Sequence, residues 1–356
     1  NKERIPVTLV QGVVKSNKAD KYLKETITEI LEEGQWDKEP RTRWADNTPA
    51  HSKFVTQKVY QYDISKGEFP INTLRTTALK GGFYDIEAIY INQTNIVEEM
   101  HPSIHSWWKD FVVFNRYRDV ENPLNTYNES DLDWKNIKLM KKESLLGKTY
   151  GATVERYNLV DKLLKGLEKN PFGRRHKMSL WQEQQVIDDP KSLEPCAGLT
   201  LWSVREERCT TYNENKTESY SMDIWDFSKQ PIEITPLSVR YIDLTLIQRS
   251  QDYLTTVSIN PAQYTMLLMM VCNHLTFKTR IKHEVGKLLH IVQNCHVYLR
   301  HMNAVNELLD RRPTGKQPKI ELICEHKEFY SHSIEDFKFS GLEGIEKLKT
   351  TLEIAV

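Results

Sequence analysis

The spacing of apolar residues predicts a chain that alternates between helices and strands. Apolar residues from Leu23 to Leu31 recur on one helical face, and Gly34 follows as a C-terminal stop signal. Residues 54–64 are rich in β-branched and aromatic side chains, which favours a strand. Residues 83–91 form an apolar run that predicts a second helix with Glu87 inside it.

The second half of the chain continues this mixture. It predicts strands at 177–181, 193–204, 241–252 and 288–292, and helices at 157–167, 261–273 and 299–309. The helix that opens at Pro261 is apolar on every side, so it should lie at the centre of the fold. No repeat, linker or heptad pattern interrupts this order. We therefore expect one α+β domain over residues 1–356.

Two polar stretches without periodicity, 116–138 and 205–240, are expected to be insertions on the surface of this domain. The chain ends in apolar residues, Leu352 to Val356, whereas most termini are polar and frayed. We expect this end to dock, either as the end of a strand or as a lid.

Composition narrows the classes of partner. The 356 residues carry 49 Lys+Arg and 49 Asp+Glu, so no overall field favours nucleic acid or an anionic membrane. An anionic ligand would need a local arginine cluster. The five cysteines are scattered without a CxxC pair, which indicates neither a metal site nor a disulfide framework. No apolar run is long enough to span a bilayer, and the first residues lack a signal-peptide pattern, so we expect a cytoplasmic protein.

Cys196 is the best candidate nucleophile among the cysteines. Pro195 fixes its backbone, and arginine-containing strands flank it in sequence, where cations would favour the reactive thiolate. Arg174, Arg175 and Arg249 could hold a phosphate. Strand alternation places Arg249 and Ser250 on opposite faces, so their joint use requires a bulge or the reach of the arginine.

Each of these signals also has an ordinary structural explanation. A Pro-Cys pair alone is weak, Glu87 fits the polar edge of an amphipathic helix, and paired tryptophans such as Trp107 and Trp108 usually belong to a core or interface. The arginines of 41–43 fit a solvated loop. Asn260, by contrast, offers a donor and an acceptor that match a uracil edge.

The order of these pieces resembles the thymidylate synthase superfamily over nearly the whole chain, apart from the two insertions. The matching pieces are Arg174-Arg175 before a strand, Pro195-Cys196, QRSQD at 248–252 with Asn260, 295–298 with His301, the IEDFKF segment, and the terminal Ile-Ala-Val. The resemblance implies a large mixed β-sheet with packed helices.

The resemblance also implies a reaction. Cys196 would add to C6 of the pyrimidine of dUMP, and C5 would then attack the one-carbon unit of 5,10-methylenetetrahydrofolate. Glu87 would order water and relay protons, and Tyr150 would lie near C5. Trp107 and Asp252 would contribute to the folate pocket, with Asp252 also serving catalysis. No metal is implied.

Further residues would bind the nucleotide or assemble the site. Arg249, Ser250, Gln248 and Arg43 would surround the phosphate and base, with Arg43 chosen from the two arginines of its segment. His296 and Tyr298 would bind the 3′-hydroxyl, and Val356 would close over the folate. Arg174 and Arg175 would reach the partner's phosphate, which implies a homodimer.

Departures from the usual synthase pattern favour a subfamily. Ala197 stands where a histidine is usual, 254–260 replaces a glycine-containing segment, and 43–51 replaces a glycine-rich phosphate loop. This pattern resembles the phage-type dUMP hydroxymethylases, which quench the exocyclic methylene with water and release tetrahydrofolate, and which would act in the host cytoplasm. Asn260 favours uracil over cytosine. The alternatives are thymidylate synthesis with release of dihydrofolate, and a non-catalytic relative that binds nucleotide or RNA.

Overall fold

A computed structural model describes residues 17–132, 140–188, 191–208 and 238–355. Its centre is a six-stranded sheet in which β8 and β9 run parallel and every other neighbouring pair is antiparallel. Its strands, in spatial order, are β1 (Gln35–Trp36), β2 (Ser52–Asp63), β9 (Lys282–Tyr298), β8 (Ser238–Asp252), β7 (Ala197–Arg208) and β6 (Lys177–Ser179). The predicted large mixed sheet is therefore confirmed.

The parallel pair requires a crossover, and the apolar helix provides it. Two helices, α7 (Tyr253–Thr256) and α8 (Ile259–Thr279), connect β8 to β9. From Pro261 to Thr276 every residue of α8 is buried, because the helix lies between the sheet and other elements. The prediction of a central helix is confirmed.

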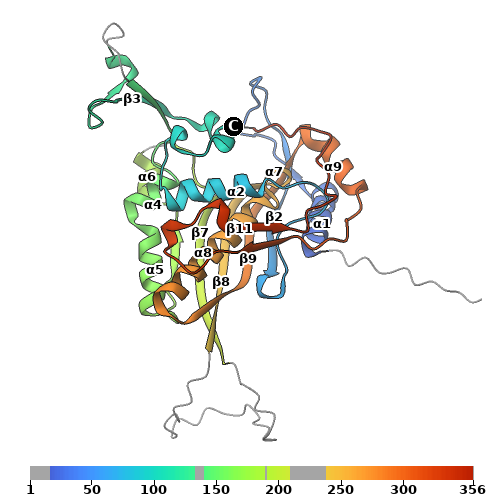
Figure 1. Cartoon of the computed structure of the whole chain (residues 1–356). Helices are drawn as coiled ribbons and strands as arrows, with labels where there is room; N and C mark the ends of the chain where they lie inside the picture. Colours follow the sequence, from blue (N-terminus) through green and yellow to red (C-terminus); the bar gives the residue numbers. More distant parts are fainter. Residues whose placement is uncertain (1–16, 133–139, 189–190, 209–237, 356) are drawn as a thin grey trace, which may run out of the picture.

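The remaining helices surround this core, with α5 at one side of the sheet and α1 and α9 at the other (Figure 1). Asn17 caps α1 (Lys18–Glu32) by accepting a 2.7 Å hydrogen bond from the Asp20 backbone, and the apolar face of α1 is buried. The predicted helix around Glu87 is two pieces, α2 (Leu79–Ile86) and a π-helical turn at Glu87–Ile91. The others are α3 (His105–Trp108), α4 (Gly151–Tyr157), α5 (Leu159–Lys169), α6 (Glu183–Asp188) and α9 (Met302–Asp310).

The first predicted insertion forms part of a second sheet that projects from the body (Figure 1). This sheet pairs β3 (Phe114–Asp119) with β4 (Thr126–Asn128) and β5 (Met140–Leu145). Glu143, 1% exposed, binds Arg116 at 2.5 Å and Arg118 at 2.6 Å, so the lobe has its own polar anchor. Residues 133–138 of this insertion lie outside the described residues, as do 209–237 of the second.

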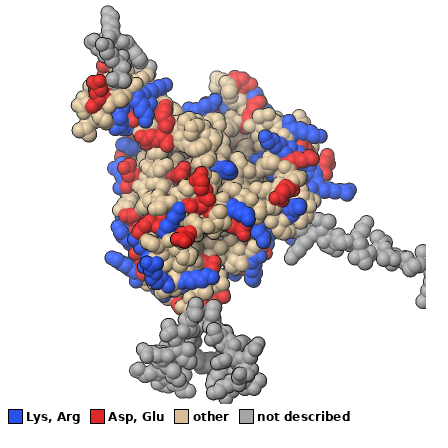
Figure 2. Space-filling view, viewed as in Figure 1, with Lys and Arg blue, Asp and Glu red and all other residues tan. Residues whose placement is uncertain are grey.

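A short pair, β10 (Lys319–Leu322) and β11 (Phe337–Ser340), precedes the C-terminal tail. Positive and negative side chains are interspersed on the face seen in Figure 2, in keeping with the equal numbers of each. Among the described helices, none has the length and hydropathy needed to cross a membrane.

Candidate active site

A cavity of about 480 Å³ opens where β7 and β8 meet α2, α8 and the tail. Its walls include Cys196, Tyr150, Asn260 and Asp252, which the sequence singles out at widely separated positions. The fold thus brings together side chains that lie far apart in the sequence.

Cys196 lies immediately before β7, and three hydrogen bonds fix the backbone around it. Its amide donates to the Tyr150 hydroxyl at 3.2 Å, and the Arg249 guanidinium donates to the carbonyls of Pro195 (3.1 Å) and Glu194 (2.8 Å). Burial raises the pKa of the Cys196 thiol, while Arg249 and then Arg41 act to lower it. The resting thiol is therefore protonated at neutral pH, and the two guanidiniums reduce the cost of forming the thiolate.

Successive side chains of β8 point to opposite faces of the sheet, which divides its polar residues into two sets. Gln248, Ser250 and Asp252 line the cavity, whereas Arg249 points to the other side and reaches back to the segment before Cys196. Joint use of Arg249 and Ser250 by one ligand therefore depends on the length of the arginine side chain rather than on a bulge in β8. The register shift in this region lies on β7, between Ala197 and Leu199.

Neither Arg41 nor Arg43 lines the cavity, and the two arginines differ in what they act on. The loop folds back on itself through a β-bridge between Arg43 and Pro49. The Arg43 guanidinium donates a 2.9 Å hydrogen bond to the Asn47 carbonyl. Arg41 instead acts electrostatically on Cys196 and Tyr298. The geometry thus favours Arg41 over Arg43 as a phosphate ligand.

Asp85, which no sequence motif indicated, is a second carboxylate that lines the cavity besides Asp252. Its oxygens accept hydrogen bonds from Trp108 (2.8 Å) and Gln263 (2.7 Å). Burial raises the pKa of Asp85 to about 6, although both hydrogen bonds act to lower it. Glu87 does not line the cavity. Two residues turn a helix by about 200°, so Glu87 faces away, where burial and then Glu335 raise its pKa.

Tyr150 owes its position to a strained turn. Its φ of +47° is unusual for a side-chain-bearing residue, and Gly151 follows because a Cβ there would lie 2.1 Å from the Thr94 carbonyl oxygen. The Tyr150 ring packs edge-on against Trp108 at 4.9 Å. Trp107, the predicted folate contact, also lines the cavity.

The far end of the cavity combines Asp252 with an arginine that no motif indicated. The Oδ1 atom of Asp252 is buried and has no hydrogen-bond partner among the described residues. Arg75 lines the same end and donates to the carbonyls of Leu254 and Thr255. Arg75 has no helical or strand pattern around it, so only tertiary structure could reveal it.

The two predicted sugar ligands, His296 and Tyr298, lie at different distances from the cavity. Tyr298 lines the cavity, and His296 lies behind it with ring centroids 5.0 Å apart. Burial lowers the pKa of His296, so its ring is neutral. In the tail, Leu352, Ile354 and Ala355 line the cavity, while Val356 lies outside the described residues.

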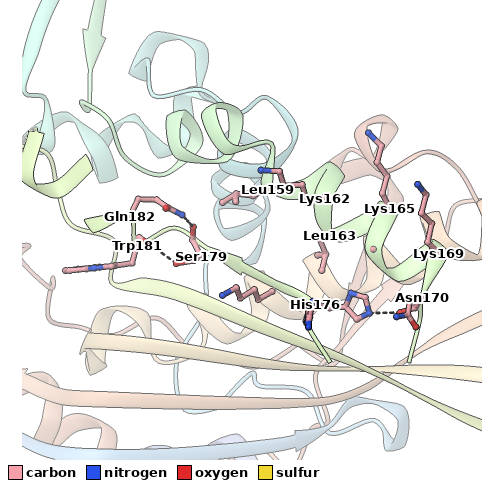
Figure 3. Close-up of a pocket in the computed structure, with 13 residues that line it drawn as sticks. Leu159, Lys162, Leu163, Lys165, Lys169, Asn170, His176, Ser179, Trp181 and Gln182 are labelled. Atoms are coloured by element: carbon pink, nitrogen blue, oxygen red, sulfur yellow. Dashed lines mark hydrogen bonds between the residues drawn. The ribbon is translucent and has the colours of Figure 1, made fainter. Parts of the chain in front are cut away.

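Arg174 and Arg175 are exposed and do not line this cavity. Arg175 borders a separate open groove of about 860 Å³ between α5 and β6, where Lys162, Lys165 and Lys169 project from α5 (Figure 3). No group of three or more His, Cys, Asp or Glu side chains within the described ranges could hold a metal ion.

The fold matches that of a solved enzyme. The thermostable thymidylate synthase A from Bacillus subtilis superposes with a TM-score of 0.66, covering 95% of this chain and 99% of that one at 24% identity. The class is thus a thymidylate-synthase-like α+β fold. The family model described as thymidylate synthase matches residues 20–354, and the chain belongs to this family.

Relatives correct the predicted subfamily. Proteins named thymidylate synthase from Streptococcus thermophilus (strain ATCC BAA-491 / LMD-9) and Streptococcus pneumoniae (strain 70585) are each 32% identical over 95% of this chain and 99% of their own length. The prediction of a dUMP hydroxymethylase is therefore wrong. Of the departures from the usual pattern, Ala197 and part of 254–260 line the cavity, whereas 43–51 does not.

Proposed function

We propose that the protein is a thymidylate synthase that converts dUMP to dTMP and releases dihydrofolate. The one-carbon donor of the family is 5,10-methylenetetrahydrofolate. The observation that carries this proposal is a single cavity lined by both Cys196 and Asn260, with Arg249 and Arg41 acting electrostatically on the Cys196 thiol.

In the first step, the Cys196 thiol gives up its proton to solvent and its sulfur forms a bond to C6 of the uracil, while the electron pair of the C5–C6 double bond moves to C5 and O4. The proposed ligands of the phosphate are Arg41, Arg249 and Ser250. A guanidinium paired with phosphate still stabilises the thiolate beside it, so substrate binding and thiol activation share the same cations.

C5 then attacks the methylene carbon of the folate, and loss of the C5 proton allows the C–N bond to the folate to break. A hydride from the resulting tetrahydrofolate reduces the exocyclic methylene to a methyl group, and Cys196 departs as the thiol. Asp85 is the carboxylate placed to handle protons at the base, because it is buried beside the cavity with its pKa near neutrality. The resemblance assigns Tyr150 a place near C5, and this assignment is supported by its position in the cavity wall, where its hydroxyl accepts from the Cys196 amide.

The folate would occupy the end of the cavity formed by Trp107, Asp252 and the tail. Trp107 offers an aromatic face, and the unpartnered Asp252 oxygen offers an acceptor. We further propose that residues 1–356 form one catalytic domain and that the enzyme is a homodimer in which Arg174 and Arg175 reach the partner's phosphate.

The test is product identity. Purified protein is incubated with dUMP and 5,10-methylenetetrahydrofolate. The mass of the nucleotide product is measured by mass spectrometry, and dihydrofolate formation is followed by absorbance. We expect dTMP and dihydrofolate in equal amounts, with none from Cys196→Ala. A product heavier by one oxygen, released with tetrahydrofolate, would contradict the proposal, and so would turnover by the alanine variant.

A further inference from the structure

An oriented chain of hydrogen bonds crosses the floor of the cavity. It begins at His290 on β9, whose Nε2 lies 2.8 Å from Gln248 Oε1. Gln248 Nε2 donates to Asn260 Oδ1 at 3.2 Å, and Asn260 Nδ2 donates to Gln263 Oε1 at 3.0 Å. Gln263 Nε2 completes the chain by donating to Asp85 Oδ2 at 2.7 Å.

This chain has only one consistent direction. Trp108 can only donate, and it occupies the other oxygen of Asp85, so the carboxylate accepts at both ends. Gln263 must therefore turn its NH₂ group toward Asp85 and its oxygen toward Asn260. At the opposite end, Gln248 Nε2 also donates to the Ser250 carbonyl at 2.9 Å, which leaves its oxygen for His290.

His290 closes the chain as a neutral donor. It is 1% exposed, and burial lowers its pKa to about 3. A neutral imidazole carries one N–H, and the contact with Gln248 Oε1 places that hydrogen on Nε2. The polarity of Asn260 is thus fixed from both sides, by His290 through Gln248 and by Asp85 through Gln263.

The direction matters because Asn260 keeps one lone pair on Oδ1 and one hydrogen on Nδ2 for a ligand in the cavity that it lines. That pair matches N3–H and O4 of uracil. Cytosine presents the opposite pattern at both positions. Reversing the Asn260 amide to suit cytosine would set NH₂ against NH₂ at Gln248 and oxygen against oxygen at Gln263.

We propose that Gln263 and His290 are positioning residues that set the preference of this site for a uracil over a cytosine nucleotide, by holding the Asn260 amide in one direction. The inference rests on the proposed function, since it assigns the base that Asn260 meets. Neither residue needs to touch the base itself.

The experiment measures dissociation constants of dUMP and dCMP for the full-length protein without folate, by calorimetry. Gln263→Met and His290→Phe preserve approximate volume but remove the polar ends that fix the amide. We expect the dUMP-to-dCMP preference to fall about tenfold or more in each, because an unpaired or reversible amide no longer rejects cytosine. His290→Gln, which can still donate, should recover much of the preference.

Thr265→Val is the matched control. Thr265 is fully buried on the same helix, and its hydroxyl donates only to the Pro261 carbonyl at 2.9 Å, so the preference should be unchanged. Wild-type preference in both Gln263→Met and His290→Phe would overturn the inference, and so would equal binding of the two nucleotides by the unmodified protein. The dTMP assay reports separately on the proposed function, because the binding ratio requires no folate chemistry.

Discussion

Asp85 is the residue whose ionisation should be visible in the stability of the whole protein. Burial raises the pKa of its carboxyl from 3.8 to about 6, so the native state holds a proton between these values that the unfolded chain has lost. The stabilisation is full below pH 3.8 and disappears as the pH rises through 6. At about 1.4 kcal/mol per pKa unit, the change is roughly 3 kcal/mol.

We expect urea unfolding to show this change as the difference between wild type and Asp85→Asn. Relative to the variant, the wild type should lose roughly 3 kcal/mol between pH 4 and pH 7. The same comparison for Glu98→Gln, an exposed carboxylate in the turn Val97–Glu99 whose pKa is lowered, should not show that loss. A flat difference for Asp85 would show that its carboxyl titrates normally.

The two arginines of the 41–43 segment allow a matched test of the phosphate site. Arg41→Gln should raise the KM for dUMP by about 10- to 100-fold, since a guanidinium–phosphate pair contributes about 1.5 to 3 kcal/mol. Arg43→Gln should change the KM little, because the Arg43 guanidinium donates to Asn47 within its own loop. Steady-state kinetics at saturating folate would decide, and equal effects at both positions would contradict the assignment.

Asp85 lies two positions before Glu87, and Arg41 lies two positions before Arg43, which are the residues that the sequence suggested. Apolar patterning located the helix around residue 85 and the loop around residue 42, but the face presented to the cavity depends on the phase of each element. A helix turns by about 200° over two residues, and a loop has no period at all. Cys196, Tyr150 and Asn260, by contrast, belong to motifs whose order could be recognised without that phase.

At the scale of elements, the tail is held over the cavity by Arg300. The guanidinium donates to Glu353 in the tail at 2.9 Å and to Asp46 in the arginine loop at 2.5 Å, and it lies 4.8 Å from the Trp44 ring centre. His301 Nε2 lies 3.0 Å from the Glu353 carbonyl oxygen. One arginine therefore links the loop proposed to bind the nucleotide phosphate to the tail proposed to cover the folate.

Arg300→Met should raise the KM for the folate severalfold and leave dUMP binding nearly unchanged. The physical reason is that a freed tail must be ordered again each time the folate binds, at a cost in conformational entropy. Arg156→Met is the control, because Arg156 also lies over an aromatic ring, 5.6 Å from the Tyr157 ring centre, but within the described residues no hydrogen bond or ion pair joins it to the tail. A larger effect on dUMP than on folate would argue against a role in the lid.

The sequence located the elements better than their ends. β2 and α8 appear where predicted, whereas β9 runs from Lys282 to Tyr298, well beyond the predicted 288–292. The polar residues at its ends pair with neighbouring strands, and no local pattern records that pairing. The hydrogen-bond chain to Asp85 joins four elements, so it too required the tertiary structure.

At the scale of the whole molecule, the proposed sharing of active sites between protomers predicts that two variants, each impaired alone, restore activity when mixed. Cys196→Ala should be inactive, and the double variant Arg174→Ala, Arg175→Ala should be strongly impaired. Mixed and allowed to exchange subunits, they should recover about a quarter of wild-type activity, since half the dimers are hybrids with one intact site each. No recovery, in a mixture shown by mass spectrometry to contain hybrids, would mean that each protomer builds its site alone.

The pairing of β2 with β9 also has a consequence for synthesis of the chain. Ser52 on β2 lies opposite Tyr298 on β9, so the two strands leave the ribosome far apart in time. Roughly 250 residues separate the two strands, and translation adds about 5–20 residues per second. β2 therefore remains without its neighbour β9 for roughly 10 to 50 seconds. Throughout that interval an aromatic, β-branched strand is an open edge to which other nascent chains can pair. We therefore expect the yield of active enzyme in cells to respond to chaperone supply and growth temperature more than to changes at the cavity.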